Sequence, residues 1–427
     1  MTIFERRGSG YYYSEDLNGH SVEAYISRLR DSSGRLSAEV AIMVDDQPVV
    51  RSSPTLTSVS GIDQFWKKLN RRIPEPDYGV DWELFCESLA GRVIDAHRQG
   101  EEIVDIASVE VPDRVEFSLA PFILKDQPSL LYGAGSSGKS TLSIWFSVLL
   151  TNSGYVNTDH QVVVTPANVL VLDYETDAVE VGRRIKWVQK GMGLPETPNI
   201  KYRRCAHPLA QEADYIKDYC DRTWGDEEVV IIVDSLGLAT GGTLDEASQV
   251  LEYFQALRWI GRTSLTLSHI NKEGLLFGSI FTTNASRNVW ELKTSPVGKN
   301  TLDVGLFHRK ANIFEKESPK GYRLDFSDDA VKVTARDVMD TGLSAELSIS
   351  ELVYAVVRTE EPIDKNRTID LVAEYKETGA DKLAPAVRTA ISRHLKTGKI
   401  QEDKSGLRLP SGVKPEPEAD KEYRAEW

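Results

Sequence analysis

The sequence predicts an α/β protein whose centre is a mostly parallel sheet with crossover helices. Three observations support this prediction. Residues 113–340 alternate short apolar runs with amphipathic helical patterns, which is typical of parallel strands joined by helices. A glycine-rich turn joins the first of these runs to a helix. Residues 341–410 then change to three helical patterns and a hairpin pattern, so we expect a separate module there.

Length and composition limit the class of protein. The 427 residues suffice for two or three domains, and a net charge of −14 argues against a uniformly basic nucleic-acid coat. Three cysteines, Cys86, Cys205 and Cys220, lack metal-ligand spacing and predict reduced thiols in a cytoplasmic protein. Neither a signal-peptide core nor a run of about 18 apolar residues is present, so we expect no membrane partner.

Residues 1–112 predict a small α+β domain without a catalytic constellation. Period-two patterns predict strands at 21–28, 36–44 and 47–51, and apolar spacing predicts helices at 62–70 and 82–97. Three consecutive tyrosines, Tyr11 to Tyr13, predict a packed or interface aromatic patch. Stacking of these rings on nucleic-acid bases is the alternative.

Residues 113–340 predict the central domain. Strand patterns occupy 129–132, 169–174, 201–205, 229–234 and 264–269, and the helical patterns between them occupy 141–151, 178–191, 212–224 and 246–260. Later strand patterns at 288–292, 301–307 and 322–326 have no helices between them. We therefore expect these last strands to extend the sheet in antiparallel fashion.

The turn after the first central strand carries a phosphate-binding signature. Residues 133–140 fit G-x-x-x-x-G-K-[ST], in which glycines let backbone N–H groups surround phosphates at a helix N-terminus. Lys139 is predicted to neutralise phosphate oxygens of ATP, and the Ser140 hydroxyl to hold Mg²⁺. The predicted binding residues are Gly133, Gly135, Ser136, Ser137, Gly138, Lys139, Ser140 and Thr141. A glycine turn without a ligand is the alternative.

Two carboxylates follow at the ends of later strands. Asp234 ends the fourth strand pattern and is predicted to be the second Mg²⁺ ligand. Ser235 comes next, where some ATPases place a water-activating glutamate. Glu175, at the end of the second strand pattern, is therefore the predicted catalytic carboxylate. The alternative is that Asp173 or Glu175 caps the following helix.

These positions together resemble the RecA-like ATPases, over roughly residues 115–315. Within that group, the sequence is most similar to DnaB-type and plasmid RepA-type hexameric helicases. The resemblance implies that His269, with Asn271 and Lys272 beside it, senses the γ-phosphate. Residues 278–280 and 284–287 resemble the family's segment near the central-channel loop.

The resemblance also implies partners and further catalytic groups. Residues 307–312 are similar to the strand that carries basic fingers into a neighbour's ATP site, so Arg309 or Lys310 is the candidate finger. A homo-oligomer follows, with a hexamer favoured. Single-stranded DNA would pass along a basic and aromatic groove, for which Lys272 and Arg287 are candidates.

Residues 341–410 predict helices at 349–357, 367–375 and 383–395 and a hairpin over 399–409. This order resembles a winged-helix domain, which implies contact with duplex DNA through residues 383–408. The predicted basic patch comprises Arg388, Arg393, His394, Lys396, Lys399, Lys404 and Arg408. A protein-docking module is the alternative, and residues 411–427 predict a disordered tail.

The sequence thus predicts an ATP-hydrolysing motor on DNA, a ring-forming helicase or translocase in replication or recombination. One rival is an ATP-switched DNA-binding loader or regulator that does not unwind. Another is a small-molecule phosphotransferase, for which the sequence offers neither an arginine-rich lid nor an acceptor pocket.

Overall fold

The computed structural model of the chain describes residues 2–410 except 8–9, 33, 74–77, 101–102, 153–161, 196–198, 243, 245, 272–273, 275, 277 and 279. Two compact units are present, one formed by Met1–Val111 with Gln211–Thr223 and one by the remaining residues. The predicted tail at 411–427 lies outside the described residues.

The first unit contains a five-stranded antiparallel sheet in the order β1-β2-β3-β4-β5. Its strands and its two N-terminal helices are β1 (Ile3–Arg7), β2 (Gly10–Leu17), β3 (His20–Ser32), β4 (Arg35–Val44), β5 (Gln47–Ser52), α1 (Val59–Asn70) and α2 (Trp82–Gln99). Buried and partly exposed residues alternate along β4, as expected for a sheet with one covered face. The sequence prediction missed β1 and β2.

The three consecutive tyrosines lie in β2. Tyr11, Tyr12 and Tyr13 are all buried, and the Tyr13 ring packs edge-on against Phe85 of α2. The packed-patch interpretation is therefore confirmed, and the alternative of base stacking by all three rings is wrong.

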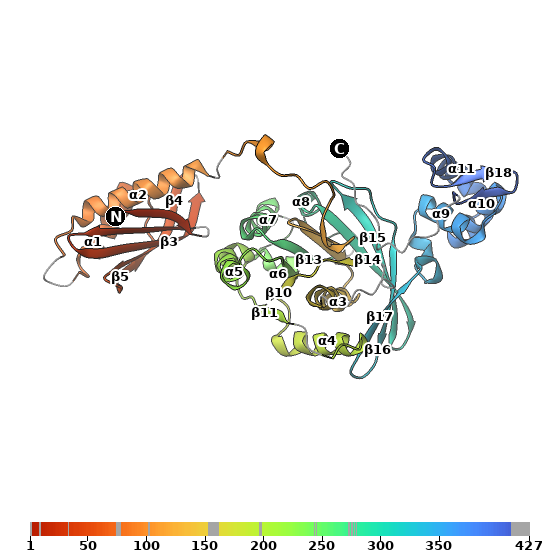
Figure 1. The fold of residues 1–427 in the computed structure, drawn as a ribbon, viewed down its shortest axis with the longest axis horizontal. Helices are drawn as coiled ribbons and strands as arrows, with labels where there is room; N and C mark the ends of the chain where they lie inside the picture. Colours follow the sequence, from red (N-terminus) through yellow and green to blue (C-terminus); the bar gives the residue numbers. More distant parts are fainter. Residues whose placement is uncertain are drawn as a thin grey trace. The chain divides into compact units, whose positions relative to one another are not determined.

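The second unit is built on a nine-stranded sheet (Figure 1), in the order β11-β10-β12-β13-β8-β14-β15-β16-β17. Its strands are β8 (Pro128–Gly133), β10 (Asn168–Asp173), β11 (Ile200–Arg204), β12 (Val229–Asp234), β13 (Thr263–His269), β14 (Asn288–Gly298), β15 (Thr301–Ala311), β16 (Lys320–Phe326) and β17 (Val331–Arg336). This arrangement confirms the predicted α/β core with a mostly parallel sheet. A separate three-stranded sheet has the order β7-β6-β9, with β6 at Phe117–Ala120, β7 at Ile123–Leu124 and β9 at Val163–Val164.

One part of the predicted strand pattern is wrong. β14 pairs in parallel with β8, whereas β15, β16 and β17 are antiparallel to their neighbours. A short helix, α8 (Ile280–Ala285), precedes β14 and returns the chain to the start of the sheet. Since α8 is only six residues long, its pattern is too short to distinguish a crossover from a loop in the sequence. β17 was also missed.

Helices cover both faces of the sheet. They are α3 (Lys139–Thr151), α4 (Ala178–Gly191), α6 (Leu236–Ala239), α7 (Ala247–Ile260) and α8, and α5 (Leu209–Trp224) connects β11 to β12. α3 is apolar on nearly every side because it is enclosed in the main core, where Trp145 and Phe146 are fully buried. α7 packs on the other face, and its Tyr253 hydroxyl lies 2.7 Å from the Thr266 hydroxyl of β13.

The parallel strands place the predicted site residues at one edge. Asp173 at the end of β10 is in register with Asp234 at the end of β12, and His269 at the end of β13 is in register with Gly133. The carboxyl ends of β8, β10, β12 and β13 therefore meet at the sheet edge where open α/β folds bind ligands.

The C-terminal residues form α9 (Ile349–Glu360), α10 (Lys365–Tyr375), α11 (Ala380–Lys396) and a hairpin of β18 (Gln401–Asp403) and β19 (Gly406–Arg408). Their shared core includes Phe307 of β15 and Leu343. One member of the predicted basic patch is wrong, because His394 is buried and bonds to Ser350 of α9. Arg408 is paired with Asp403.

Among the described residues, the structure has no helix that is both long and apolar enough to cross a membrane.

The contact between α4 and β17 generates a stability prediction. A Cβ on Gly191 at the end of α4 would lie 1.9 Å from the Val331 carbonyl oxygen, whereas one on Gly182 in the same helix would meet nothing within 4 Å. Gly191→Ala should destabilise the protein by about 1–3 kcal/mol through overpacking. Gly182→Ala should stabilise it by about 0.5–1 kcal/mol. Urea unfolding measures both, and a shift in the same direction for both variants would contradict the packing.

Candidate nucleotide-binding site

The glycine-rich loop lies between β8 and α3, and its backbone conformation explains why some of its residues are glycines. Gly138 has φ of 86° and Ser136 has φ of 56°, so the loop twice enters the left-handed region. A Cβ on Gly133 would lie 2.5 Å from the Leu292 carbonyl oxygen of β14. At Gly135 a Cβ would meet open space, so the packing does not require glycine there.

Lys139 lies folded back against the loop that carries it. Its Nζ donates to the carbonyl oxygens of Gly133 at 3.0 Å and Ala134 at 2.7 Å. Burial lowers the pKa of Lys139 below its usual value, and the charges of Asp234 and Glu175 partly oppose that shift. Phosphate oxygens at the loop would replace the two carbonyls as acceptors and favour the charged ammonium.

The loop and β12 together supply the groups that a magnesium–nucleotide complex needs. Burial raises the pKa of Asp234, and the nearby Ser140 hydroxyl partly opposes that shift. The Ser137 hydroxyl is buried and has no hydrogen-bond partner among the described residues. A hydroxyl and a carboxylate suit Mg²⁺, which commonly takes its other ligands from water and phosphate. These residues therefore fit ATP with Mg²⁺.

The described residues hold no cluster of three or more His, Cys, Asp or Glu side chains arranged for a metal ion.

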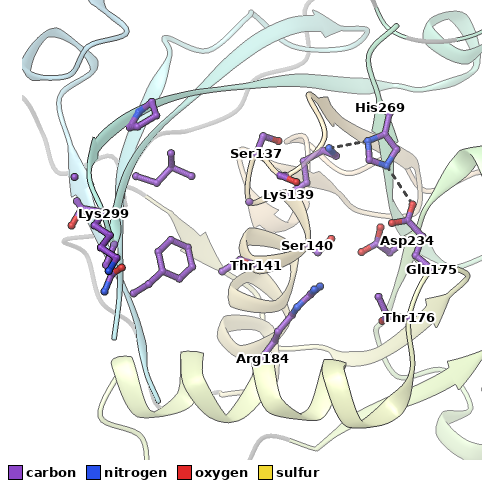
Figure 2. Close-up of a pocket in the computed structure, with 18 residues that line it drawn as sticks. Ser137, Lys139, Ser140, Thr141, Glu175, Thr176, Arg184, Asp234, His269 and Lys299 are labelled. Atoms are coloured by element: carbon purple, nitrogen blue, oxygen red, sulfur yellow. Dashed lines mark hydrogen bonds and ion pairs between the residues drawn. The ribbon is translucent and has the colours of Figure 1, made fainter. Parts of the chain in front are cut away.

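Glu175 is held by two neighbours from other strands. The Ser235 hydroxyl, at the end of β12, donates to its Oε1, and His269 Nε2 lies 3.3 Å from the same oxygen. His269 Nδ1 in turn lies 3.3 Å from Lys139 Nζ. One neutral tautomer satisfies both contacts, with Nδ1 accepting from Lys139 and Nε2–H donating to Glu175. Figure 2 shows this chain from Lys139 through His269 to Glu175.

The turn that carries Glu175 is fixed by Asp173. The buried Asp173 carboxylate accepts from the backbone N–H of Glu175 at 2.9 Å and from that of Thr176 at 3.0 Å. The Tyr202 hydroxyl of β11 lies 3.1 Å from the other carboxylate oxygen. The alternative that Asp173 or Glu175 caps the next helix is wrong, because Asp177 is the N-cap of α4.

These groups line a cleft of about 550 Å³ that extends well beyond the loop. Thr176 and Arg184 form one wall, and Figure 2 shows Arg184 reaching into the cleft from α4. The opposite wall is the turn between β14 and β15 together with Leu302 and Phe326. The sequence did not predict Arg184, Thr176 or the far wall as parts of the site. The far wall carries no motif, since it becomes part of the site only when the antiparallel strands fold beside the loop.

The match to a known protein family agrees with this geometry at the level of the domain. Residues 99–274 match the profile of the AAA domain family, which is less than half of the chain. The structure is also similar to a KaiC-like protein of the archaeon Pyrococcus horikoshii, at 15% identity and a TM-score of 0.37. That match covers 52% of this chain and 99% of the other. No curated protein sequence matches the chain.

The match over residues 99–274, the loop and the sheet together indicate the fold of a P-loop ATPase core. Of the predicted site residues, the cleft brings together Ser136, Ser137, Gly138, Lys139, Ser140, Thr141, Glu175, Asp234 and His269. Gly133 and Gly135 shape the loop but do not line the cleft.

The two predicted finger residues lie elsewhere and are held by their own chain. Arg309 donates through Nε to Glu291 Oε2 at 2.7 Å. Lys310 Nζ donates to the carbonyl oxygens of Thr283, Asn284 and Ser286, at 2.7, 3.0 and 2.8 Å, where α8 ends. Neither side chain lines the cleft. Lys310 therefore caps the C-terminal end of α8. No pattern in the sequence indicated this role.

The predicted channel-side segment is described only in part. Lys272 and Ser279 lie outside the described residues. Gly278 has φ of 107°, and a Cβ there would lie 2.8 Å from Leu244 Cβ, so this position requires glycine. Arg287 is exposed. Burial lowers the pKa of Lys310, and the nearby charge of Arg287 lowers it further.

The hydrogen bond from Ser235 to Glu175 can be tested by mutation. Ser235→Ala removes a hydrogen bond to a carboxylate, worth about 1.5–3 kcal/mol, and should lower ATP turnover at least about tenfold while nucleotide affinity changes little. Glu175→Gln should lower turnover by roughly 10²-fold or more. Steady-state hydrolysis and fluorescent-nucleotide binding separate the two effects.

Ser268→Ala is the matched control. Ser268 is a buried serine at the end of β13 whose hydroxyl has no hydrogen-bond partner among the described residues, so its removal should leave turnover unchanged. Equal effects of Ser235→Ala and Ser268→Ala would contradict a supporting role for Ser235.

Proposed function

We propose that this protein is an ATP-hydrolysing motor that acts on DNA as a ring-forming helicase or translocase, in replication or recombination. The observation that carries the proposal is Glu175, a half-exposed carboxylate held by Ser235 and His269 at the mouth of a phosphate-binding loop. A loop that only binds nucleotide has no need of a positioned base. The proposed role in replication or recombination rests only on the resemblance of the sequence to ring helicases.

In the proposed hydrolysis each group has its own task. Loop N–H groups and Lys139 bind the phosphate chain, and Ser140 and Asp234 would hold Mg²⁺, which neutralises phosphate charge when bound. Glu175 is placed to orient a water molecule and accept its proton. Ser235 and His269 fix the carboxylate, and contact between His269 and Lys139 links the base to the phosphate-binding side chain.

The far wall of the cleft provides room for the nucleobase. Leu302 and Phe326 supply apolar surface, and Lys299 and Asn300 supply polar groups beside it. A base on this wall would leave its phosphates at the loop, since both walls belong to one cleft. This placement supports a nucleoside triphosphate rather than a smaller phosphate compound.

The exposed face of α11 supports contact with DNA. Arg388, Arg393 and Lys396 lie on one side of this helix and line a shallow groove of about 530 Å³ with Thr389 and Ser392. Within the described part of the chain, none of these three cations forms an ion pair, so their charges are available for phosphates. Three helices and a hairpin with an unpaired basic helix support the winged-helix interpretation and duplex DNA as its ligand.

The alternative, a DNA-binding loader or regulator switched by ATP, has one observation in its favour. Arg309 and Lys310, the candidate fingers, are both engaged within their own chain. A motor needs one of them, or another cation such as Arg287, to reach a neighbouring site. A strand-displacement assay with ATP separates the two functions, since a loader binds DNA and nucleotide without separating strands.

Lys139 provides the direct test of ATP hydrolysis. Lys139→Ala should abolish hydrolysis and sharply weaken nucleotide binding, because the phosphates lose their positioned cation. Phosphate release and nucleotide titration measure these effects. Lys125→Ala is the control, since Lys125 is paired with Glu116 away from the cleft. Hydrolysis by Lys139→Ala near the wild-type rate would remove the phosphate-loop assignment.

Neutralising α11 tests the DNA interaction. Combining Arg388→Gln, Arg393→Gln and Lys396→Gln should weaken duplex binding and flatten its salt dependence. Each lost phosphate contact lowers the slope of log affinity against log salt by roughly 0.9. ATP hydrolysis without DNA should persist, because none of the three lines the nucleotide cleft.

The control for α11 removes the same charge from the C-terminal end of α1 and its C-cap, through Lys67→Gln, Lys68→Gln and Arg71→Gln. Unchanged affinity and slope in the α11 variant would instead favour a protein-docking role for the C-terminal module. Point substitutions are preferable to deletion of the module, because deletion would expose Phe307 of β15.

A further inference from the structure

The groove on α11 is lined only by exposed basic and hydroxyl side chains, which are Arg388, Thr389, Ser392, Arg393 and Lys396. The acids of the neighbouring hairpin are engaged elsewhere. Glu402 pairs with Lys365 at 2.7 Å, and Asp403 pairs with Arg408. In a protein with a net charge of −14, such a surface attracts acidic parts of its own chain as well as nucleic acid.

We propose that an acidic segment of the protein's own C-terminal tail docks in this groove and competes with DNA for it. The segment is residues 415–420, beyond the described residues, and its sequence contains Glu416, Glu418 and Asp420 and no lysine or arginine. Its carboxylates therefore complement the three cations of the groove. The competition rests on the proposed contact of α11 with DNA, whereas the docking of the tail does not.

The hairpin that leads to the tail begins against the last turn of α11. The backbone N–H groups of Lys399 and Ile400 donate to the His394 carbonyl oxygen, at 2.9 and 3.4 Å. The His394 side chain is buried and bonds to Ser350 of α9. The end of α11 and the start of β18 are therefore fixed within one module.

The second strand of the hairpin returns the chain to the same place. Gln401 at the start of β18 is in register with Arg408 at the end of β19. Gln401 Nε2 also donates to the Leu409 carbonyl oxygen, at 3.2 Å. The described chain thus ends at Pro410, about one strand spacing from the residues that follow α11, and the tail starts near the end of the helix that carries Lys396.

The tail is long enough to cover the groove. Glu416 is six residues beyond Pro410, and an extended chain advances about 3.3 Å per residue, so the segment can reach about 20 Å from the hairpin. Arg388 and Lys396 are eight residues apart on α11, or about 12 Å along the helix axis. Tethering places the segment at the groove at an effective concentration in roughly the millimolar range, so even a weak contact would be populated.

The groove suits carboxylates as well as phosphates. The guanidinium groups of Arg388 and Arg393 present paired donors that can bind a carboxylate through two hydrogen bonds each. The Ser392 hydroxyl supplies a further donor. A tethered segment loses less translational freedom on docking than a separate protein does, which favours the tail over an unrelated acidic partner.

The first experiment measures whether the tail limits DNA binding by the full-length protein. Glu416→Gln, Glu418→Gln and Asp420→Asn together should tighten duplex binding about threefold or more, because the tethered competitor is lost. The gain should shrink as salt rises, since salt screens the contact between tail and groove. Fluorescence anisotropy of a labelled duplex at several salt concentrations measures both effects.

The matched control removes the same charge from exposed side chains of α9 and α10, through Glu360→Gln, Asp370→Asn and Glu374→Gln. This variant should bind the duplex as wild type does. An equal gain in the control would show a general effect of net charge and would overturn the proposal.

The second experiment locates the tail without DNA. A photo-reactive phenylalanine derivative in place of Ala419 should cross-link to α11 within one chain, with a yield that does not change on dilution. The cross-link should disappear when Arg388→Gln, Arg393→Gln and Lys396→Gln are combined in the same protein. A cross-link that persists in that variant, or never reaches α11, would overturn the proposal. A yield that falls on dilution would also overturn it, because the occupant would then be the tail of another copy.

The docking of the tail and the DNA contact of α11 fail in different ways. A cross-link to α11 with unchanged duplex affinity in the tail variant would keep the tail in the groove, and would remove both the competition and the role of α11 in binding DNA. Duplex binding that depends on α11, without any cross-link from the tail, would keep the DNA contact and remove the tail.

Discussion

The structure depends on one chain of hydrogen bonds that joins the ends of four parallel strands. Lys139 after β8 contacts His269 of β13, which contacts Glu175 after β10, which accepts from Ser235 after β12. Such a chain requires the four strand ends to lie at one level. The register of the parallel sheet provides that alignment, and the packing around α3 holds it. Glu175 and Lys139 are therefore positioned by the same sheet that forms the core.

The antiparallel part of the sheet completes the cleft that the ends of the parallel strands begin. β14 approaches β8 so closely that Gly133 has no room for a side chain, and the turn after β14 becomes the far wall of the cleft. The same strands carry Arg309 and Lys310 and, through Phe307, contact the core of the C-terminal module. β15 thus touches both the nucleotide-binding half and the module that we propose to bind DNA. If a change of nucleotide moved β15, the movement would be transmitted to the C-terminal module through this contact.

The sequence alone could predict those parts of the site that depend on short motifs of consecutive residues. The phosphate loop, Asp234 and Glu175 were predicted because strand ends and glycine turns leave patterns in a few consecutive residues. The hydrogen bond from Ser235 to Glu175, the wall at Phe326 and the capping of α8 by Lys310 depend on residues that only folding brings together. β2 was missed because its run of tyrosines lacks the alternation of a half-buried strand. His394 was placed in a basic patch because charge alone does not show which side of a helix is buried.

Glu175, held by Ser235 and His269, is expected to face a nucleotide bound at the loop. A crystal structure with a non-hydrolysable ATP analogue and Mg²⁺ tests it most directly. In that structure Lys139 should leave the carbonyls of Gly133 and Ala134 for phosphate oxygens, with Ser140 at the metal. Glu175 should keep its bond to Ser235 and lie one water molecule away from the γ-phosphate. A nucleotide bound elsewhere, or Glu175 turned away from the phosphates with Ser235 unbonded, would contradict it.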